Sequence, residues 1–185
     1  DLKFWYPTDV MVTGYDIIFF WVARMIMAGL EFTDSIPFRD VYITGMIKDD
    51  QGRWMSKSLG NGIDPEDMID KYGSDAVRFT MISLASEGQD IKLATSRFES
   101  GRNFANKLWN SYRFLMSQVE RLLIPLNPVR KQDVNSESLL MDRWIIHRLN
   151  RALDRLHASA ECYRVNEMMN AIYDFFWKDY CDWYL

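Results

Sequence analysis

Two short segments near the start of the chain share one pattern, and they constrain the fold more than any other feature. Asp9–Gly14 (DVMVTG) and Asp40–Gly45 (DVYITG) are each an apolar, β-branched run that ends in Thr-Gly. Apolar runs without polar alternation are typical of parallel strands covered on both faces of a sheet. Ile17–Leu30 between them has helical length and helix-forming composition, so the sequence predicts a strand–helix–strand unit. Two strands are fewer than the ~4–6 of a usual open sheet, so we expect part of a larger domain.

The ends of these predicted strands indicate where a ligand would bind. In open parallel sheets, ligands bind beyond the carboxyl ends of the strands. Four residues follow or end the two predicted strands, and we expect them near any site: Gly14, Asp16, Thr44 and Gly45.

The second half of the chain is predicted to be helical. Ser96-Arg97-Phe98-Glu99 has the pattern of a capping box, which predicts a helix start at Ser96. An apolar stripe at spacings of three and four follows it: Phe98, Gly101, Phe104, Leu108, Tyr112, Leu115, Val119 and Leu122. Pro125 and Pro128 begin a predicted linker to about Ser138, and two further helices follow, over Leu140–Leu156 and Val165–Tyr184.

A short helix is predicted before this region. Asp64 is a good N-cap, Pro65 suits the first helical position, and Gly73 ends the helix. Ser74 is predicted to cap the next helix, which runs from Asp75 to about Ala85.

Composition narrows the class of protein. The chain has a net charge of −4, yet Lys92–Lys131 holds eight basic and two acidic residues, a local charge of +6. A basic segment in an acidic protein favours a polyanion partner, and a solvated helix surface is the alternative. Cys162 and Cys181 form neither a CxxC pair nor a zinc pattern, so we expect buried free thiols and a cytoplasmic location. No signal peptide or membrane span is predicted.

The most informative loop is Gly52–Asn61 (GRWMSKSLGN). Its glycines permit backbone conformations that other residues resist. Lys57 is a compact positive charge suited to phosphate, and the flanking Ser56 and Ser58 can donate hydrogen bonds. The spacing excludes a Walker A loop. A mobile loop of this kind can stabilise charge on a leaving pyrophosphate, and a plain surface turn is the alternative.

Met55–Asn61 (MSKSLGN) resembles the Lys-Met-Ser-Lys-Ser motif of the class I aminoacyl-tRNA synthetases, class Ia in particular. Gly73–Thr80, Arg102–Asn110 and Trp177–Tyr184 are similar to other class Ia segments and stand in the same order. Gly14–Met25 resembles the valine-specific members more than the leucine or isoleucine ones, with isoleucine the runner-up. Several ordered matches are more specific than one motif.

The resemblance implies a fold class and a division of the chain. We expect an α/β N-terminal piece, the C-terminal part of a class I Rossmann-like catalytic fold, followed by a mainly α-helical bundle. Residues 1–50 would end the catalytic fold, 51–94 would be the stem-contact region with the loop, and 95–185 the anticodon-binding bundle, truncated at Leu185. The implied reaction is activation of valine with ATP and its transfer to valine tRNA.

The resemblance also implies roles for individual residues. Lys57, between Ser56 and Ser58, would contact the ATP phosphates and stabilise the transition state of adenylate formation. Asp16 would hold the ribose of the adenylate. The remaining implied ATP or adenylate contacts are Gly14, Thr44, Gly45 and Met55. The implied amino-acid pocket contains Ile17 and Trp21, for which ordinary core is the alternative. Mg²⁺ would enter with the ATP phosphates, and no protein-bound metal is predicted.

Two departures from the family pattern qualify the resemblance. Trp54 stands where the family usually has lysine, and we expect it to position the loop by packing or stacking. The family's His-x-Gly-His motif is absent, since His147 and His157 are the chain's only histidines. We therefore expect an interior fragment that makes no valyl-adenylate by itself.

The predicted helices would bind tRNA in this family. Arg102, Lys107 and Arg113 are the candidates for phosphate contacts. The aromatic residues of Trp177–Tyr184 could stack on anticodon bases, but their helical spacing favours core. An RNA-binding module without catalysis stays open as the alternative. Neither a membrane nor a DNA partner is predicted.

Overall fold

The computed structural model describes residues 1–123 and 139–185, which form two compact units. The first unit comprises residues 1–62 and 84–94, and the second comprises residues 63–83 and 95–185. The predicted linker with Pro125 and Pro128, and the basic residues Arg130 and Lys131, lie outside the described residues.

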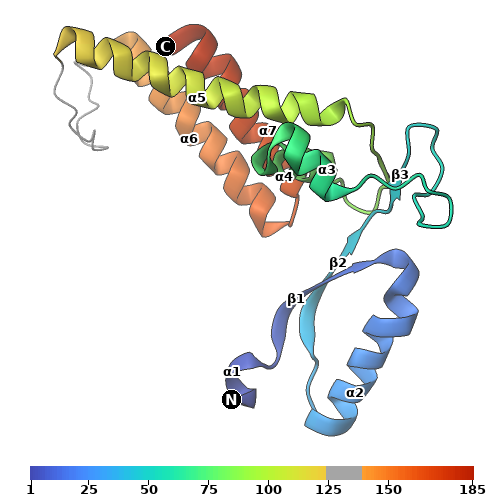
Figure 1. The fold of residues 1–185 in the computed structure, drawn as a ribbon. Coiled ribbons are helices and arrows are strands. Elements are labelled where there is room, and N and C mark those ends of the chain that lie inside the picture. Colours follow the sequence, from blue (N-terminus) through green and yellow to red (C-terminus); the bar gives the residue numbers. More distant parts are fainter. Residues whose placement is uncertain (124–138) are drawn as a thin grey trace. The chain divides into compact units, whose positions relative to one another are not determined.

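The first unit contains the predicted strand–helix–strand motif (Figure 1). A short helix, α1 (Leu2–Trp5), precedes strand β1 (Thr8–Gly14), which pairs in parallel with β2 (Phe38–Thr44). The register runs from Thr8 opposite Phe38 to Gly14 opposite Thr44, so both strands end at the same edge. This arrangement confirms the α/β prediction for the start of the chain.

The segment between these strands differs in one respect from the prediction. Ile17–Leu30 was expected as one α-helix, but regular helix α2 spans only Ala23–Thr33. A 3₁₀ turn, η1 (Tyr15–Ile17), and a π-helical turn, η2 (Ile18–Val22), come first. The chain leaves β1 abruptly, and a Cβ on Gly14 would lie 2.7 Å from Oδ1 of Asp16. The tight exit from the strand therefore replaces the first α-helical turns.

A second small sheet completes the first unit. Strands β3 (Ile47–Lys48) and β4 (Ile91–Lys92) pair in parallel, Ile47 opposite Ile91. The sequence did not predict them, because two residues show no periodicity. A side chain on Gly45 would overlap the backbone of Gln89, so glycine permits the close approach of these two segments.

The second unit begins with the short helix predicted at Asp64. Helix α3 spans Pro65–Tyr72, and Oδ1 of Asp64 accepts a hydrogen bond from the Glu66 amide at 2.9 Å, which confirms the cap. Gly73 ends the helix with a φ of 91°, a conformation that favours glycine. Helix α4 spans Ser74–Leu84.

The long helix α5 spans Arg97–Leu122, as its apolar stripe predicts. The predicted capping box is wrong, because Ser96 has a helical backbone conformation and its side chain makes no capping hydrogen bond. The Oγ of an N-cap reaches the first amides only from an extended backbone. A Cβ on Gly101 would lie 2.5 Å from the carbonyl oxygen of Ala76, so α4 and α5 cross closely at this glycine.

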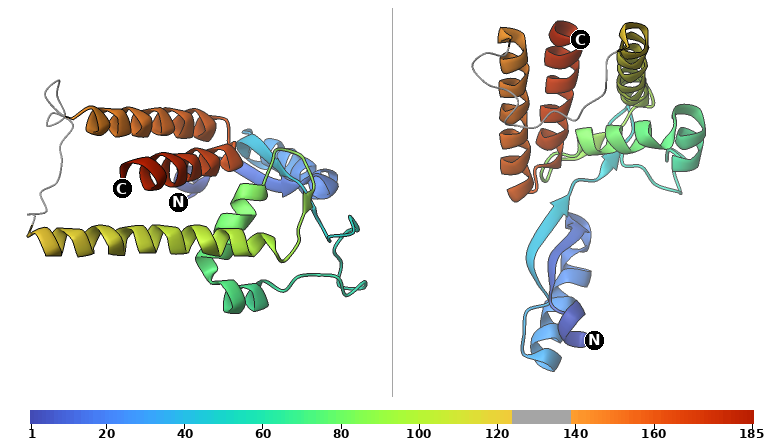
Figure 2. Two further views of the ribbon diagram at one scale, coloured as in Figure 1. Left: turned by 90° about the horizontal axis from the view of Figure 1, so that it is seen from above. Right: turned by 90° about the vertical axis from the view of Figure 1, so that its left-hand side faces the viewer.

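Three helical segments lie side by side in the second unit (Figure 2). Helix α6 spans Leu140–Glu161, and α7 (Val165–Tyr173) continues into the π-helical η4 (Asp174–Tyr184). The α7–η4 segment lies between α5 and α6. This arrangement is the mainly helical second part that the sequence predicted.

Aromatic rings form the core of the second unit. Phe104 is 4% exposed. The centroid of its ring lies 4.8 Å from the ring centroid of Phe79, 4.9 Å from that of Tyr173 and 6.3 Å from that of Trp177. Only the first half of the α5 stripe is buried, since Tyr112 is 54% exposed. The expected burial of both thiols is also wrong, because Cys162 is exposed and Cys181 is half-buried.

No helix within residues 1–123 and 139–185 is long and apolar enough to cross a bilayer.

Candidate functional site

The carboxyl ends of β1 and β2 bring the predicted strand-end residues together. Gly14 and Thr44 are register partners, and the Thr44 hydroxyl donates to the carbonyl oxygen of Thr13 at 3.3 Å. Asp16 lies in η1 directly beyond β1 and is exposed. Gly45 follows β2. The first unit therefore presents the exposed carboxylate of Asp16 at the sheet edge where Gly14, Thr44 and Gly45 lie.

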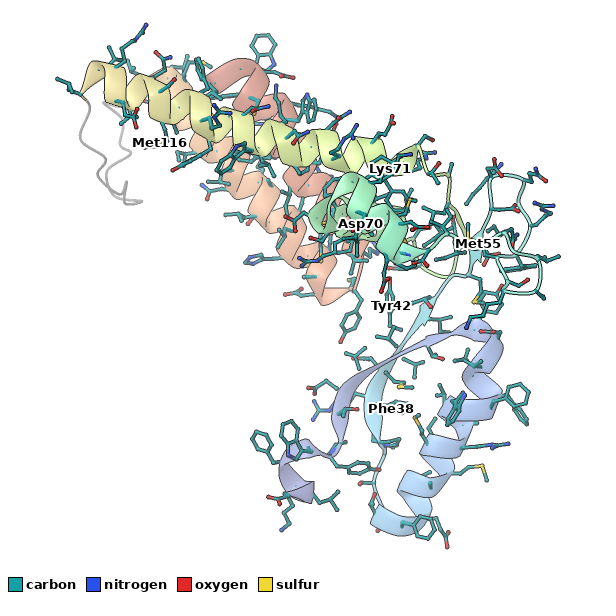
Figure 3. The ribbon with its side chains drawn as sticks, in the orientation of Figure 1. Phe38, Tyr42, Met55, Asp70, Lys71 and Met116 are labelled. Atoms are coloured by element: carbon teal, nitrogen blue, oxygen red, sulfur yellow. The ribbon has the colours of Figure 1, made fainter. Side chains whose placement is uncertain are left out.

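The loop that carries Lys57 is an ordered double turn. We call residues 49–61 the lysine loop. Its first turn reverses the chain after β3, so that Trp54 bridges back to Lys48 and the Met55 amide donates to the carbonyl of Ile47 at 3.2 Å. Met55 is labelled in this loop in Figure 3. Its second turn holds the motif and closes where the Gly60 amide donates to the carbonyl of Lys57 at 3.3 Å.

Asp49 lies buried at the base of the lysine loop. Its Oδ1 accepts hydrogen bonds from the amides of Gln51 (3.1 Å) and Arg53 (2.8 Å). Its Oδ2 accepts from Nε of Arg53 (2.8 Å) and Nδ2 of Asn61 (3.0 Å). The hydrogen bond from Asn61, with those from Arg53, lowers the pKa of Asp49 from 3.8 to about 2. Asp49 is therefore ionised whenever the loop is folded at neutral pH.

The side chains of the motif are arranged at the second turn. The hydroxyls of Ser56 and Ser58 are 3.2 Å apart, and Oγ of Ser56 accepts from the Leu59 amide at 3.3 Å. Lys57 is exposed, and its side chain makes no ion pair with a residue in the described part of the chain. The ammonium group is consequently free to meet an anion.

Trp54 packs within the first unit, at the base of the lysine loop. The Nζ atom of Lys48 lies 4.2 Å from the Trp54 ring centroid, and the Tyr15 ring lies 6.5 Å away, edge-on. A cation over an indole face is attracted by the ring quadrupole. Trp54 thus connects the loop to the residue that follows β1.

An acidic residue from the end of the first unit supports the same region. Asp90 pairs with Lys48 at 2.9 Å and accepts from the Met46 amide (3.1 Å) and the Tyr15 hydroxyl (3.3 Å). The hydrogen bond from Lys48 is the main cause that lowers the pKa of Asp90. Burial, with the charge of Asp90, raises the pKa of Tyr15. Asp90, the residue before β4, therefore links β3 and η1 by polar contacts.

The two predicted pocket residues are not core of this chain. Ile17 ends η1 and is 39% exposed, while Trp21 lies in η2 and is 58% exposed. Both lie in the irregular turns directly beyond Asp16, where π-type geometry is often found at functional sites.

The predicted tRNA-binding residues all lie on α5 in the second unit. Arg102 lies over the Tyr72 ring at 5.5 Å, and Arg113 is exposed. Lys107 is partly engaged, because its Nζ lies 3.8 Å from Asp182 and 5.2 Å from the Trp177 ring. Arg113 is therefore the least engaged of the three.

The C-terminal aromatic residues divide between core and surface. Trp177 stacks on Tyr173 at 5.4 Å, and Tyr180 lies between Phe176 (5.5 Å) and Tyr184 (6.0 Å). Trp183, in contrast, is 74% exposed.

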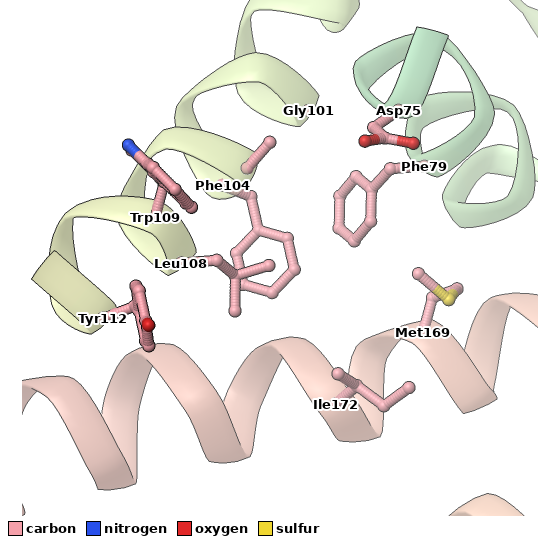
Figure 4. A pocket seen from close by; sticks show the side chains of 10 residues that line it. Asp75, Phe79, Gly101, Phe104, Leu108, Trp109, Tyr112, Met169 and Ile172 are labelled. Atoms are coloured by element: carbon pink, nitrogen blue, oxygen red, sulfur yellow. The ribbon is translucent and has the colours of Figure 1, made fainter.

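A pocket of about 590 Å³ lies between α4, α5 and α7 (Figure 4). Its lining is mostly apolar, with Phe79, Leu108 and Ile172 among the residues whose side chains face it. Among the described lining residues, Asp75 is the charged one, and a carboxylate oxygen of Asp75 lies 3.5 Å from a guanidinium nitrogen of Arg78. The mostly apolar lining gives a small ligand few polar groups to bind.

Two solved aminoacyl-tRNA synthetases share this fold. A Mycobacterium tuberculosis methionyl-tRNA synthetase in complex with methionyl-adenylate has a TM-score of 0.72 and 26% identity, covering 94% of this chain and 33% of that one. An Agrobacterium radiobacter K84 LeuRS–tRNA–LeuAMS ternary complex also has a TM-score of 0.72, at 24% identity, with 94% and 22% covered.

The sequence identifies the family. Residues 1–94 match the tRNA synthetases class I (I, L, M and V), and the chain belongs to this family. Residues 142–185 match the anticodon-binding domain of tRNA ligase. Relatives named valine–tRNA ligase are 48% identical in Bacillus subtilis, 46% in Treponema pallidum and 49% in Chlorobaculum tepidum, over the whole chain. The chain spans about a fifth of these relatives, 20%, 19% and 21% respectively.

Sequence reasoning missed the residues that hold the lysine loop, namely Asp49, Asn61, Lys48 and Asp90. An acid in a polar turn and an asparagine after a glycine are common in loops, so neither stands out alone. Asp49 and Asn61 are 12 positions apart, and this spacing indicates a contact between them only once the double turn is known.

Proposed function

We propose that the full-length protein containing this chain activates valine with ATP and transfers it to valine tRNA. The observation that carries this proposal is the ordered lysine loop, which presents an exposed Lys57, without an ion pair to any residue of 1–123 or 139–185, in the unit that also presents Asp16. Relatives named valine–tRNA ligase, 46–49% identical along the whole chain, support the choice of amino acid.

The proposed chemistry assigns one task to each group. The valine carboxylate attacks the α-phosphate of ATP, and pyrophosphate leaves. Lys57 stabilises the charge that develops on the leaving pyrophosphate, assisted by hydrogen bonds from Ser56 and Ser58. Asp16 accepts hydrogen bonds from the ribose hydroxyls, since an ionised carboxylate is an acceptor only.

The remaining first-unit residues would shape the substrate sites. Gly14, Thr44, Gly45 and Met55 would line the adenylate, and Ile17 and Trp21 the valine side chain. Mg²⁺ would arrive bound to the ATP phosphates. A cytoplasmic location fits this role, as do the proposed parts: residues 1–50 as the end of the catalytic fold, 51–94 as the stem-contact region and 95–185 as the anticodon-binding bundle.

The test is valine-dependent ATP–pyrophosphate exchange by the full-length protein. Lys57→Ala should lower the rate about 10²- to 10³-fold, as expected for loss of one transition-state contact. Trp54→Ala should lower the exchange rate much less, because Trp54 packs against Lys48 and Tyr15 to hold the loop, whereas the proposed phosphate contact is made by Lys57. Equal losses would contradict these roles, and faster exchange with isoleucine than with valine would overturn the choice of amino acid.

A second candidate is an RNA-binding module without catalysis. It is favoured for the 185-residue chain alone by the absence of His-x-Gly-His from its sequence. We propose that this chain by itself makes no valyl-adenylate but binds tRNA through Arg102, Lys107 and Arg113. A titration with valine tRNA, isoleucine tRNA and a valine tRNA of altered anticodon, at two salt concentrations, separates the outcomes. Equal, salt-sensitive binding to all three would indicate phosphate contacts alone.

A further inference from the structure

The two turns of the lysine loop are joined by the buried carboxylate of Asp49 and the side-chain amide of Asn61. Asp49 is 5% exposed and lies inside the first turn, where it accepts from two backbone amides and from Arg53. Asn61 lies at the far end of the second turn. The Asn61 side chain donates to Oδ2 of Asp49 and to the Trp54 carbonyl, both at 3.0 Å. We call this pair the Asp49–Asn61 clasp.

The clasp reaches the residue that precedes the motif lysine. Oδ1 of Asn61 accepts a hydrogen bond from the Ser56 amide at 3.0 Å. The Asn61 amide group therefore uses its acceptor on the second turn and its two donors on the first. One residue further on, the carbonyl of Lys57 closes the tip of the second turn. The backbone of Lys57 is thus fixed on both sides, while its side chain stays exposed.

We propose that Asp49 and Asn61 are positioning residues that hold the backbone of Lys57 in the geometry required for phosphate contact. The role rests on the proposed function of Lys57. A long, flexible lysine side chain loses much freedom on binding, and a preset backbone reduces the part that must be ordered. Reacting groups misplaced by about 1 Å can lower a rate about 10²-fold.

The clasp requires a carboxylate at position 49. Four donors converge on its two oxygens, two on each. An asparagine of the same shape has one acceptor oxygen and one amide nitrogen that only donates. In Asp49→Asn, the amide nitrogen must therefore face a pair of donors on one side. Asp50→Asn is the matched control, because Asp50 is the next residue and is exposed.

The first measurement is hydrogen exchange of the 185-residue chain without any ligand. Amides in residues 51–61 should exchange about tenfold faster in Asp49→Asn, the effect of one lost charged hydrogen bond, and at the wild-type rate in Asp50→Asn. Far-UV circular dichroism should be unchanged in both variants. Unchanged exchange in Asp49→Asn would overturn the clasp. Asn61→Ala is the second variant, and it should reproduce the effect without altering the buried carboxylate.

The second measurement tests positioning in the full-length protein. Asp49→Asn and Asn61→Ala are each made in the wild-type and in the Lys57→Ala background. In the wild-type background, Asp49→Asn should lower kcat for valine-dependent exchange about 10- to 100-fold, with KM for valine unchanged. In the Lys57→Ala background it should have less than about a twofold effect, because groups that act through one residue are not additive. An equal loss in both backgrounds would overturn the positioning role.

The two measurements also separate failure of this inference from failure of the proposed function. If the wild-type protein shows no valine-dependent exchange, or if Lys57→Ala exchanges at the wild-type rate, the proposed function is wrong. The positioning role is then wrong as well. Hydrogen exchange would still decide whether the clasp orders the loop.

Discussion

Phe104→Ala should be among the most damaging single truncations in the second unit. Phe104 is 4% exposed and its ring contacts Phe79 and Tyr173 at centroid distances below 5 Å. Removing a buried phenyl ring costs its transfer free energy and leaves a cavity, together about 3–5 kcal/mol. Because whole domains are stable by only about 5–15 kcal/mol, the loss should be visible as a large shift of the unfolding midpoint.

The same helix provides a matched control. Phe114 is 50% exposed, so Phe114→Ala loses about half of the transfer term, roughly 1 kcal/mol, and leaves no enclosed cavity. Urea unfolding of the two variants, followed by far-UV circular dichroism, measures both changes in free energy. An equal loss for Phe104→Ala and Phe114→Ala would refute the assignment of the core to the first half of α5.

Three further outcomes are expected. Gly101→Ala should destabilise the second unit in urea unfolding by about 1–3 kcal/mol, because the new Cβ would lie 2.6 Å from Oγ1 of Thr80, a clash that exceeds the gain in helix propensity. Asp64→Ala should cost about 0.5–2 kcal/mol in the same assay through loss of the α3 cap, while Asp64→Asn should retain most of it. The pKa of Asp49 is about 2 in the folded chain and 3.8 in the unfolded chain, so ionised Asp49 should stabilise the first unit above about pH 4. This contribution should fade as the pH drops towards about 2, and Asp49→Asn should flatten that part of a curve of stability against pH.

Local pattern was sufficient for several parts of the molecule. The two Thr-Gly runs predicted β1 and β2 and the edge where they end, because apolar composition and strand ends are properties of short segments. Asp64, Pro65 and Gly73 predicted the limits of α3, since caps involve only neighbouring residues. The motif around Lys57, with the other ordered segments, indicated the family.

Tertiary contacts decided the rest. Strands β3 and β4 are two residues each, and they exist because chain segments more than 40 positions apart meet at Gly45 and Gln89. The buried half of the α5 stripe packs against α3 and α4, where Phe98 stacks on Tyr72 and Gly101 approaches Ala76, and periodicity alone cannot state which neighbours cover a stripe.

The lysine loop shows the same division most clearly. By itself the sequence supplied the lysine, its serines and their resemblance to a phosphate-binding motif. Only the folded double turn brings Asn61 to Asp49 and fixes the backbone that carries Lys57. A hydrogen bond needs two groups at a defined distance and angle, and the sequence specifies the groups but not that geometry.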